Sequence, residues 1–153
     1  MAALELKIPP PLVGIATAAL MYGVAQWVPA AAFAPPARVG LAALIAICGV
    51  AIDLSALYAF HRHRTTVNPL APERTSVIVS NGVYRFTRNP MYLGMLVLLL
   101  AWCVWLANAA ALVGPALFAG YITRFQIFPE ERILLANFGE PYLQYMRRVR
   151  RWC

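Results

Sequence analysis

The stretch Gly82-Val-Tyr-Arg-Phe-Thr-Arg-Asn-Pro-Met-Tyr-Leu-Gly94 carries a basic, polar run directly into an apolar segment that continues to Ala107. Asn89 is predicted to be the N-cap of a helix, because its side-chain amide oxygen can accept a hydrogen bond from a first-turn N–H group. Pro90 is predicted to be the first helical residue, where its missing N–H donor costs nothing. A helix start with unpaired N–H groups favours an anionic group. Tyr92 lies in this first turn, and we expect a binding site there.

The composition indicates an integral membrane protein. The chain has 153 residues, of which 61% are hydrophobic and 12% charged, with a formal net charge of +7. Soluble domains have about 45–50% apolar residues. Since each helical span needs about 20 apolar residues, the length allows a single domain, 1–153, with about four transmembrane helices. No glycine-rich dinucleotide-binding pattern is found, which argues against a soluble Rossmann-type enzyme. Most Lys and Arg flank apolar spans, so the charge does not indicate a nucleic-acid partner.

The predicted fold is therefore an all-α integral membrane protein. Spans are expected at about residues 12–28, 39–60, 91–107 and 109–128. The last two are separated only at Asn108, so they are expected to form a tight helical hairpin. A polar loop is expected at 61–90. Amphipathic surface helices are expected at 129–151, divided at Gly139 and Pro141.

The arginines predict the orientation in the membrane. They concentrate in the 61–90 loop and the C-terminal segment, and the other side is left with Arg38. The positive-inside rule therefore makes both termini and the loop cytoplasmic. The cluster Arg147-Arg148-Val-Arg150-Arg151 is expected to bind anionic lipids, with about 1 kcal/mol from each basic residue near the surface. Aromatic and apolar residues of the same segment recur at helical spacing, and we expect this face to cover the site opened by Asn89.

Three acidic residues are candidates for chemistry. Glu130 and Glu131 follow Pro129, where acids complement a helix start; alternatively, one carboxylate could accept hydrogen bonds from the two hydroxyls of a ribose. Asp53 lies within the second span, where a charge costs about 2.5–3.5 kcal/mol, so it should face the bundle interior or a wet cavity. A structural hydrogen bond and a role at a substrate pocket would both explain it. His61 and His63 point to different faces of a helix, so no metal site is predicted.

Read in order, these elements resemble the isoprenylcysteine carboxyl methyltransferase and phospholipid methyltransferase superfamily of membrane enzymes. The resemblance runs from Ile52 to Trp152. It rests on the series Thr65-Thr-Val-Asn-Pro69, Val79-x-x-Gly-Val-Tyr-Arg85, Arg88-Asn-Pro-Met-Tyr-x-Gly94, Pro129-Glu-Glu131 and Phe138-Gly-x-x-Tyr-x-x-Tyr145. It implies S-adenosylmethionine as the cofactor. The cofactor-binding residues that it implies are Ser76, Val77, Ile78, Val79, Tyr84, Asn89, Pro90, Met91, Tyr92 and Glu130.

The resemblance also bears on the methyl acceptor. The prenylcysteine enzymes have a substrate-contacting arginine one turn before the acid, and Gln126 stands at that position here. We assign Gln126 to substrate binding and expect a lipid or lipophilic small molecule other than a prenylated cysteine. The expected reaction is transfer of the sulfonium methyl to this acceptor at the cytoplasmic membrane face. Glu131 and Asp53 are candidates for the proton acceptor, and Arg88 for a contact with substrate or cofactor charge.

Two other functions are open. A non-catalytic membrane binding or assembly protein could retain the fold, although such a scaffold needs neither the Asn-Pro-Met-Tyr run nor the Glu-Glu pair. The C-terminal part of membrane sterol reductases is distantly similar and uses NADPH, although its usual larger bundle of spans is absent here. Cofactor binding distinguishes the three functions.

Overall fold

The computed structural model describes residues 5–27, 35–63 and 77–153. Every regular element in these ranges is helical, so the predicted all-α fold is confirmed there. The first three long helices are α1 (Pro10–Trp27), α2 (Pro35–His63) and α3 (Pro90–Leu106), which lie close to the first three predicted spans. The sequence motif at 65–69 and the predicted cofactor residue Ser76 lie outside the described residues.

Two helical stretches are long and apolar enough to cross a membrane. They are Ala37–Arg62 and Ala109–Phe138. The α3 helix is also apolar, but its 17 residues fall short of the about 20 that a span requires. Length and composition therefore support two spans in the described chain, and the prediction of four is not confirmed.

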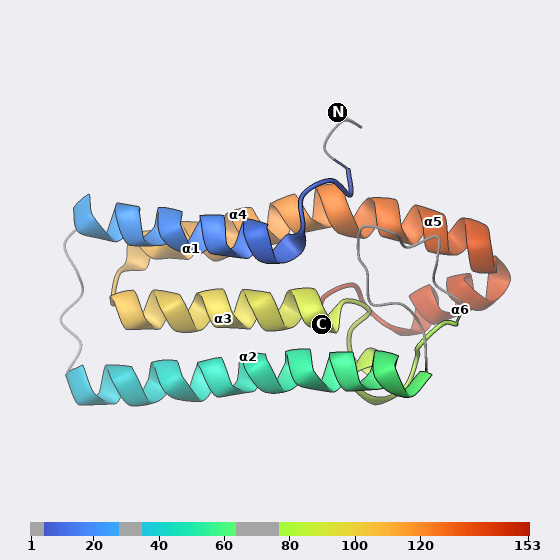
Figure 1. The fold of residues 1–153 in the computed structure, drawn as a ribbon, viewed down its shortest axis with the longest axis horizontal. Helices are drawn as coiled ribbons and strands as arrows, with labels where there is room; N and C mark the ends of the chain where they lie inside the picture. The colour runs from blue at the N-terminus through green and yellow to red at the C-terminus, as the bar shows by residue number, and fades with distance from the viewer. Residues whose placement is uncertain (1–4, 28–34, 64–76) are drawn as a thin grey trace.

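The α3 helix lies at the centre of the bundle. Figure 1 shows α2 along one side of α3, and α1 and α4 (Val113–Ile122) along the other. Between α1, α3 and α4 the core is built from large buried side chains, including Met21, Leu99 and Phe118. The α2 helix approaches the α3 backbone closely at Gly49. A Cβ atom added there would lie 3.1 Å from the carbonyl oxygen of Gly94. Small residues of this kind let helix backbones pack closely where lipid surrounds them.

Two residues join α3 to the next helical stretch. Ala107 has a left-handed φ of 50°, which ends α3. The side-chain oxygen of Asn108 accepts a 2.9 Å hydrogen bond from the Ala110 N–H and caps the 3-10 turn η4 (Ala109–Leu112), which leads into α4. The predicted tight hairpin at Asn108 is therefore confirmed.

The helix that begins with α4 continues through a proline. A π-helical turn, η5 (Thr123–Ile127), connects α4 directly to α5 (Phe128–Phe138), in which Pro129 lies in the first turn. Pro129 cannot donate to the carbonyl four residues earlier, which belongs to Phe125. The Phe125 carbonyl instead accepts a 3.0 Å hydrogen bond from the Leu6 N–H. The π-helical turn and the N-terminal segment thus let the helix pass Pro129 without leaving that carbonyl unpaired.

The chain then folds back on itself at Gly139, which has a φ of 59°. It separates α5 from α6 (Glu140–Arg148), so the predicted division is confirmed. The side chains that pack together across this corner are Leu134, Phe138, Tyr142, Tyr145 and Val149. This is the apolar face predicted from helical spacing. Figure 1 shows α5, α6 and the C-terminus at the same end of the bundle as the start of α3.

Gly114→Ala should destabilise the bundle, because the added Cβ would overlap Cγ of Met21, whose side chain is only 1% exposed. Overpacking of this kind costs about 1–3 kcal/mol. Gly120→Ala on the same helix is the matched control, since no described atom lies within 4 Å of its added Cβ. Thermal unfolding in detergent measures the difference, and equal melting temperatures for the two variants would contradict the packing described between α1 and α4.

Candidate functional site

The loop before α3 is fixed by contacts on two sides. Its 3-10 turn η3 (Gly82–Arg85) begins at Gly82, whose φ of 58° suits glycine. Tyr84 is buried, and its ring meets Phe60 of α2 edge to face, with 5.4 Å between centroids. The Tyr84 carbonyl accepts a 2.8 Å hydrogen bond from the hydroxyl of Tyr145 on α6. The loop is therefore held between the end of α2 and α6.

Asn89 occupies the N-cap position and Pro90 opens α3, as predicted. The predicted capping hydrogen bond is wrong, because the Asn89 side chain makes no bond to a first-turn N–H group. Its Nδ2 donates to the carbonyl of Arg151 at 2.9 Å, and the Thr87 hydroxyl donates to the same carbonyl at 3.2 Å. The Asn89 amide is therefore tied to the C-terminal segment, and the first turn of α3 has no side-chain cap.

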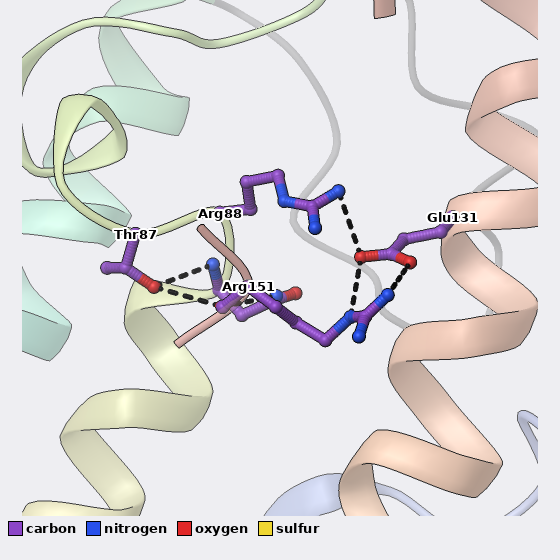
Figure 2. Close-up of polar contacts among 5 residues, drawn as sticks. Thr87, Arg88, Glu131 and Arg151 are labelled. Carbon is purple, nitrogen blue, oxygen red and sulfur yellow. Dashed lines mark hydrogen bonds and ion pairs between the residues drawn. The ribbon is translucent and has the colours of Figure 1, made fainter. Parts of the chain in front are cut away.

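Glu131 is paired with two arginines beside this turn (Figure 2). Arg151 donates to both carboxylate oxygens, from Nε at 3.0 Å and from Nη2 at 2.8 Å. Nη1 of Arg88 lies 3.1 Å from Oε1 of the same carboxylate. The side chains of Arg88 and Glu131 are 9% and 10% exposed, so both charges are largely removed from water. A bidentate arginine–carboxylate pair fixes geometry as well as charge, so Glu131 links α5 to the C-terminal segment and the loop.

The C-terminal segment makes further contacts around Arg151. The Arg88 N–H donates to the Arg150 carbonyl at 3.0 Å, and Nε1 of Trp152 donates to Oγ1 of Thr123 at 3.1 Å. The Arg151 guanidinium lies 4.8 Å from the centre of the Phe128 ring. Of the cluster predicted to bind anionic lipids, Arg151 therefore turns inward, whereas the other three arginines are exposed.

Tyr92 and Glu130 join the first turn of α3 to α5. The Tyr92 hydroxyl donates a hydrogen bond to Oε1 of Glu130, and Tyr92 is buried. The two neighbouring acids therefore have different partners: Glu130 binds Tyr92, whereas Glu131 binds the arginines. This contact brings together the helix start and the acid that the sequence analysis assigned to one site.

The hydroxyls of Tyr84 in the loop and Tyr145 on α6 are neutral at ordinary pH. Burial, with smaller contributions from Tyr145 and Glu130, raises the pKa of Tyr84 far above its usual range. Burial also raises the pKa of Tyr145 to about 12, against the opposing charge of Arg88. The hydrogen bonds from Arg151 to Glu131 raise the pKa of Arg151. At neutral pH the tyrosine hydroxyls are therefore hydrogen-bond donors, and Arg151 is charged.

Asp53 of α2 lies against Gly94, one turn into α3. A Cβ atom added at Gly94 would overlap the Asp53 carboxylate, so glycine makes room for it. Oδ1 of Asp53 is buried and has no hydrogen-bond partner among the described residues. Asp53 thus faces α3 inside the bundle, one turn after that helix begins at Pro90.

Gln126 is anchored to the N-terminal segment. Its side chain is buried, and Nε2 donates to the Ile8 carbonyl at 2.7 Å. Two arginines nearby, Arg124 and Arg132, pair with Glu5, and the 2.9 Å hydrogen bond from Arg124 is the main cause that lowers the pKa of Glu5. In the described chain, no side-chain hydrogen bond connects Gln126 to the contact between Tyr92 and Glu130.

The remaining predicted cofactor residues gather near the end of α2. Val79 is buried against two alanines of α2, with Met91 packed beside it. Ile78 packs against the apolar face of α6, whereas Val77 is exposed. The structure therefore brings most of the described candidates to one end of the bundle.

Sequence reasoning missed Arg151, Thr87 and Tyr145 as residues that build this site. The burial of Tyr145 was evident from the helical spacing, but its partner on the loop was not. Arg151 lies among other arginines, and nothing in the sequence distinguishes it from Arg150, which also follows Val149.

These features define an α-helical protein with apolar helices and a polar site at one end of the bundle. The model of the phospholipid methyltransferase family matches residues 37–141, which extend from α2 to the beginning of α6. The chain therefore belongs to the phospholipid methyltransferase family.

Three individual relatives are similar to parts of the chain. Over 72 and 75 residues the chain is 36% identical to the protein-S-isoprenylcysteine O-methyltransferases of Xenopus laevis and Homo sapiens, respectively. These matches cover 47% and 49% of this chain but only 25% and 26% of those enzymes. An uncharacterized protein of Haemophilus influenzae is 47% identical over 62 residues, which are 40% of this chain and 98% of that protein. No solved structure matches the chain.

Glu131→Gln should strongly destabilise the protein, because it leaves Arg88 and Arg151 without their common negative charge. Removing one partner of a buried ion pair costs about 3–5 kcal/mol, and the partial exposure of Arg151 places the expected loss near the lower figure. Glu140→Gln is the control, since Glu140 is exposed and bonded only weakly to Gln144. Chemical unfolding in detergent should separate the variants, and equal stabilities would show that Glu131 does not hold this end of the bundle together.

Proposed function

We propose that this protein transfers a methyl group from S-adenosylmethionine to a lipid or lipophilic small molecule at the cytoplasmic face of a membrane. Family membership supports methyl transfer in general, and the two named relatives are methyltransferases. The observation that carries the proposal is the hydrogen bond between Tyr92 in the first turn of α3 and Glu130 on α5. It joins a helix start suited to an anion with a carboxylate suited to hydroxyl groups.

The residues near this contact fit the parts of S-adenosylmethionine. The turn from Asn89 to Tyr92 would hold its carboxylate, and Glu130 would accept hydrogen bonds from its ribose hydroxyls. Val79 and Tyr84 would provide apolar surface for the adenine. Oδ1 of Asp53, buried and without a partner among the described residues, supports the presence of a further polar ligand group nearby. When bound, S-adenosylmethionine supplies a methyl group that its sulfonium charge has already activated.

The protein's own contribution is positioning, exclusion of water and, for an amine or hydroxyl acceptor, removal of a proton. Glu131 and Asp53 are the two candidates for that last task. Both oxygens of Glu131 already accept hydrogen bonds from Arg151, and Nη1 of Arg88 lies 3.1 Å from Oε1. Oδ1 of Asp53 has no hydrogen-bond partner among the described residues, so we assign proton removal to Asp53. An acceptor that is itself a carboxylate would need no base.

In this proposal four helices lie in the bilayer: α1, α2, α3 and the stretch from Ala109. Both termini and the site are cytoplasmic, in line with the arginine distribution. Exposed Leu44, Ile47 and Leu54 give α2 an apolar surface suited to lipid and to the entry of a lipophilic acceptor. The exposed arginines at the end of α6 support contact with anionic lipids.

Glu130→Ala should weaken the binding of S-adenosylhomocysteine at least about tenfold, or 1.4 kcal/mol, because the ribose hydroxyls lose their acceptor. Calorimetric titration into detergent-purified protein measures this affinity. Glu140→Ala is the control, as Glu140 is exposed and lies on α6. If the folded wild type bound no S-adenosylhomocysteine, the cofactor assignment would be wrong, and titration with NADPH would test the reductase alternative.

Asp53→Asn should lower the rate of methyl transfer about a hundredfold while leaving the affinity for S-adenosylhomocysteine unchanged, because the amide cannot take a proton. The rate is measured as incorporation of a labelled methyl group from S-adenosylmethionine into a total membrane lipid extract. Ser55→Ala, at an exposed position on the same helix, is the control. An unchanged rate in Asp53→Asn would remove Asp53 from the reaction.

A further inference from the structure

Arg88 has unused hydrogen-bond donors although it is buried. Its side chain is 9% exposed, and its Nε and Nη1 make no hydrogen bond with any described residue. Nη1 lies 3.1 Å from Oε1 of Glu131, but that carboxylate already accepts two hydrogen bonds from Arg151. Buried charged donors are costly when they are unpaired. Arg88 is therefore equipped to bind a further acceptor.

The charges of the cluster formed by Arg88, Arg151 and Glu131 also do not balance. Arg88 and Arg151 bring two positive charges, and Glu131 brings one negative charge. Glu130, the neighbouring acid, is hydrogen-bonded to Tyr92 and forms no ion pair with either arginine in the described part of the chain. A ligand group with one negative charge would therefore balance the cluster.

The start of α3, directly after Arg88, favours the same kind of ligand. The first main-chain hydrogen bond of this helix runs from the Leu93 N–H to the Asn89 carbonyl at 3.0 Å. The N–H groups of Met91 and Tyr92 precede it, and the side chain of Asn89, whose Nδ2 donates to Arg151, does not cap them. Such a helix start attracts a carboxylate or phosphate. The guanidinium and the helix start are separate observations that indicate an anion.

We propose that Arg88 and the uncapped start of α3 bind a carboxylate or similar anion, and that Arg151 keeps Arg88 available by occupying both oxygens of Glu131. The inference rests on the proposed function, in which the anion is the carboxylate of the methyl donor. The headgroup of an anionic lipid is the other source of the same chemistry. Arg88 is the binding residue, whereas Arg151 acts through Glu131 and is a positioning residue.

The test compares two ligands that differ in the carboxylate. S-adenosylhomocysteine carries it, whereas 5′-methylthioadenosine lacks the whole amino-acid part. Both are titrated calorimetrically into the protein in phosphatidylcholine nanodiscs. Arg88→Gln should weaken S-adenosylhomocysteine about tenfold or more and 5′-methylthioadenosine less than twofold. Arg150→Gln is the matched control, because only the main chain of Arg150 contacts the site and its side chain is exposed.

The role of Arg151 is tested in the same assay. Arg151→Gln frees an oxygen of Glu131 for Arg88, so S-adenosylhomocysteine should again be weakened while 5′-methylthioadenosine is not. In the Arg88→Gln background, Arg151→Gln should cause little further loss, since the two residues act on one group. A merely structural role of Arg151 would instead weaken both ligands, and it would do so with or without Arg88.

A second variant keeps the test decisive if Arg88→Gln does not fold. Arg88→Lys keeps the charge but loses the planar donor group, so it should weaken S-adenosylhomocysteine by an intermediate factor and spare 5′-methylthioadenosine. Equal weakening of both ligands, or no change in either, overturns the assignment of the donor carboxylate to Arg88.

Retention of phosphatidylglycerol, measured by native mass spectrometry, tests the other source of the anion. If the ratio of the two nucleoside affinities is unchanged but Arg88→Gln loses bound phosphatidylglycerol relative to the wild type, the site holds a lipid headgroup. If the folded wild type binds neither nucleoside, the proposed function fails, and this lipid measurement alone decides the anion site. No change in either measurement overturns the anion site itself.

Discussion

The pairing of Glu131 with two arginines is the interaction on which the functional end of the bundle depends. One carboxylate joins α5 to the loop that precedes α3 and to the segment that follows α6. These three parts of the chain do not share a helix. Because the pair is largely buried, either partner alone would be an uncompensated charge. The arrangement is therefore held as a unit.

A second constraint acts on the helix that carries Glu131, and it comes from the N-terminal segment. Pro129 leaves the Phe125 carbonyl without its helical donor, and the Leu6 N–H provides one. Gln126, next in the π-helical turn, binds the Ile8 carbonyl. The helix that carries Glu130 and Glu131 is thus fixed by the N-terminal segment before these acids and by the C-terminal segment at them. The acids can have different partners because neighbouring side chains on a helix point in directions about 100° apart.

The sequence predicted what depends on local pattern. Apolar runs located α1, α2 and α3, the isolated Asn108 predicted the hairpin, and spacing predicted the buried face of α6. It did not predict that Asn89 would donate to Arg151, because that contact joins residues 62 positions apart. The same limit applies to Glu131, whose local pattern is that of an ordinary first-turn acid. Partners that are distant in sequence meet only because the helices pack together. The periodicity of apolar residues does not specify which side chains that packing brings into contact.

The order of the pairing partners along the chain has a consequence for folding. Glu131 and Arg88 both precede Arg151 in the sequence, and α6 lies between Glu131 and Arg151. The bidentate pair between Glu131 and Arg151 can therefore form only after the chain through α6 has been synthesised. Folding of this end of the bundle thus follows synthesis of the helices that it joins.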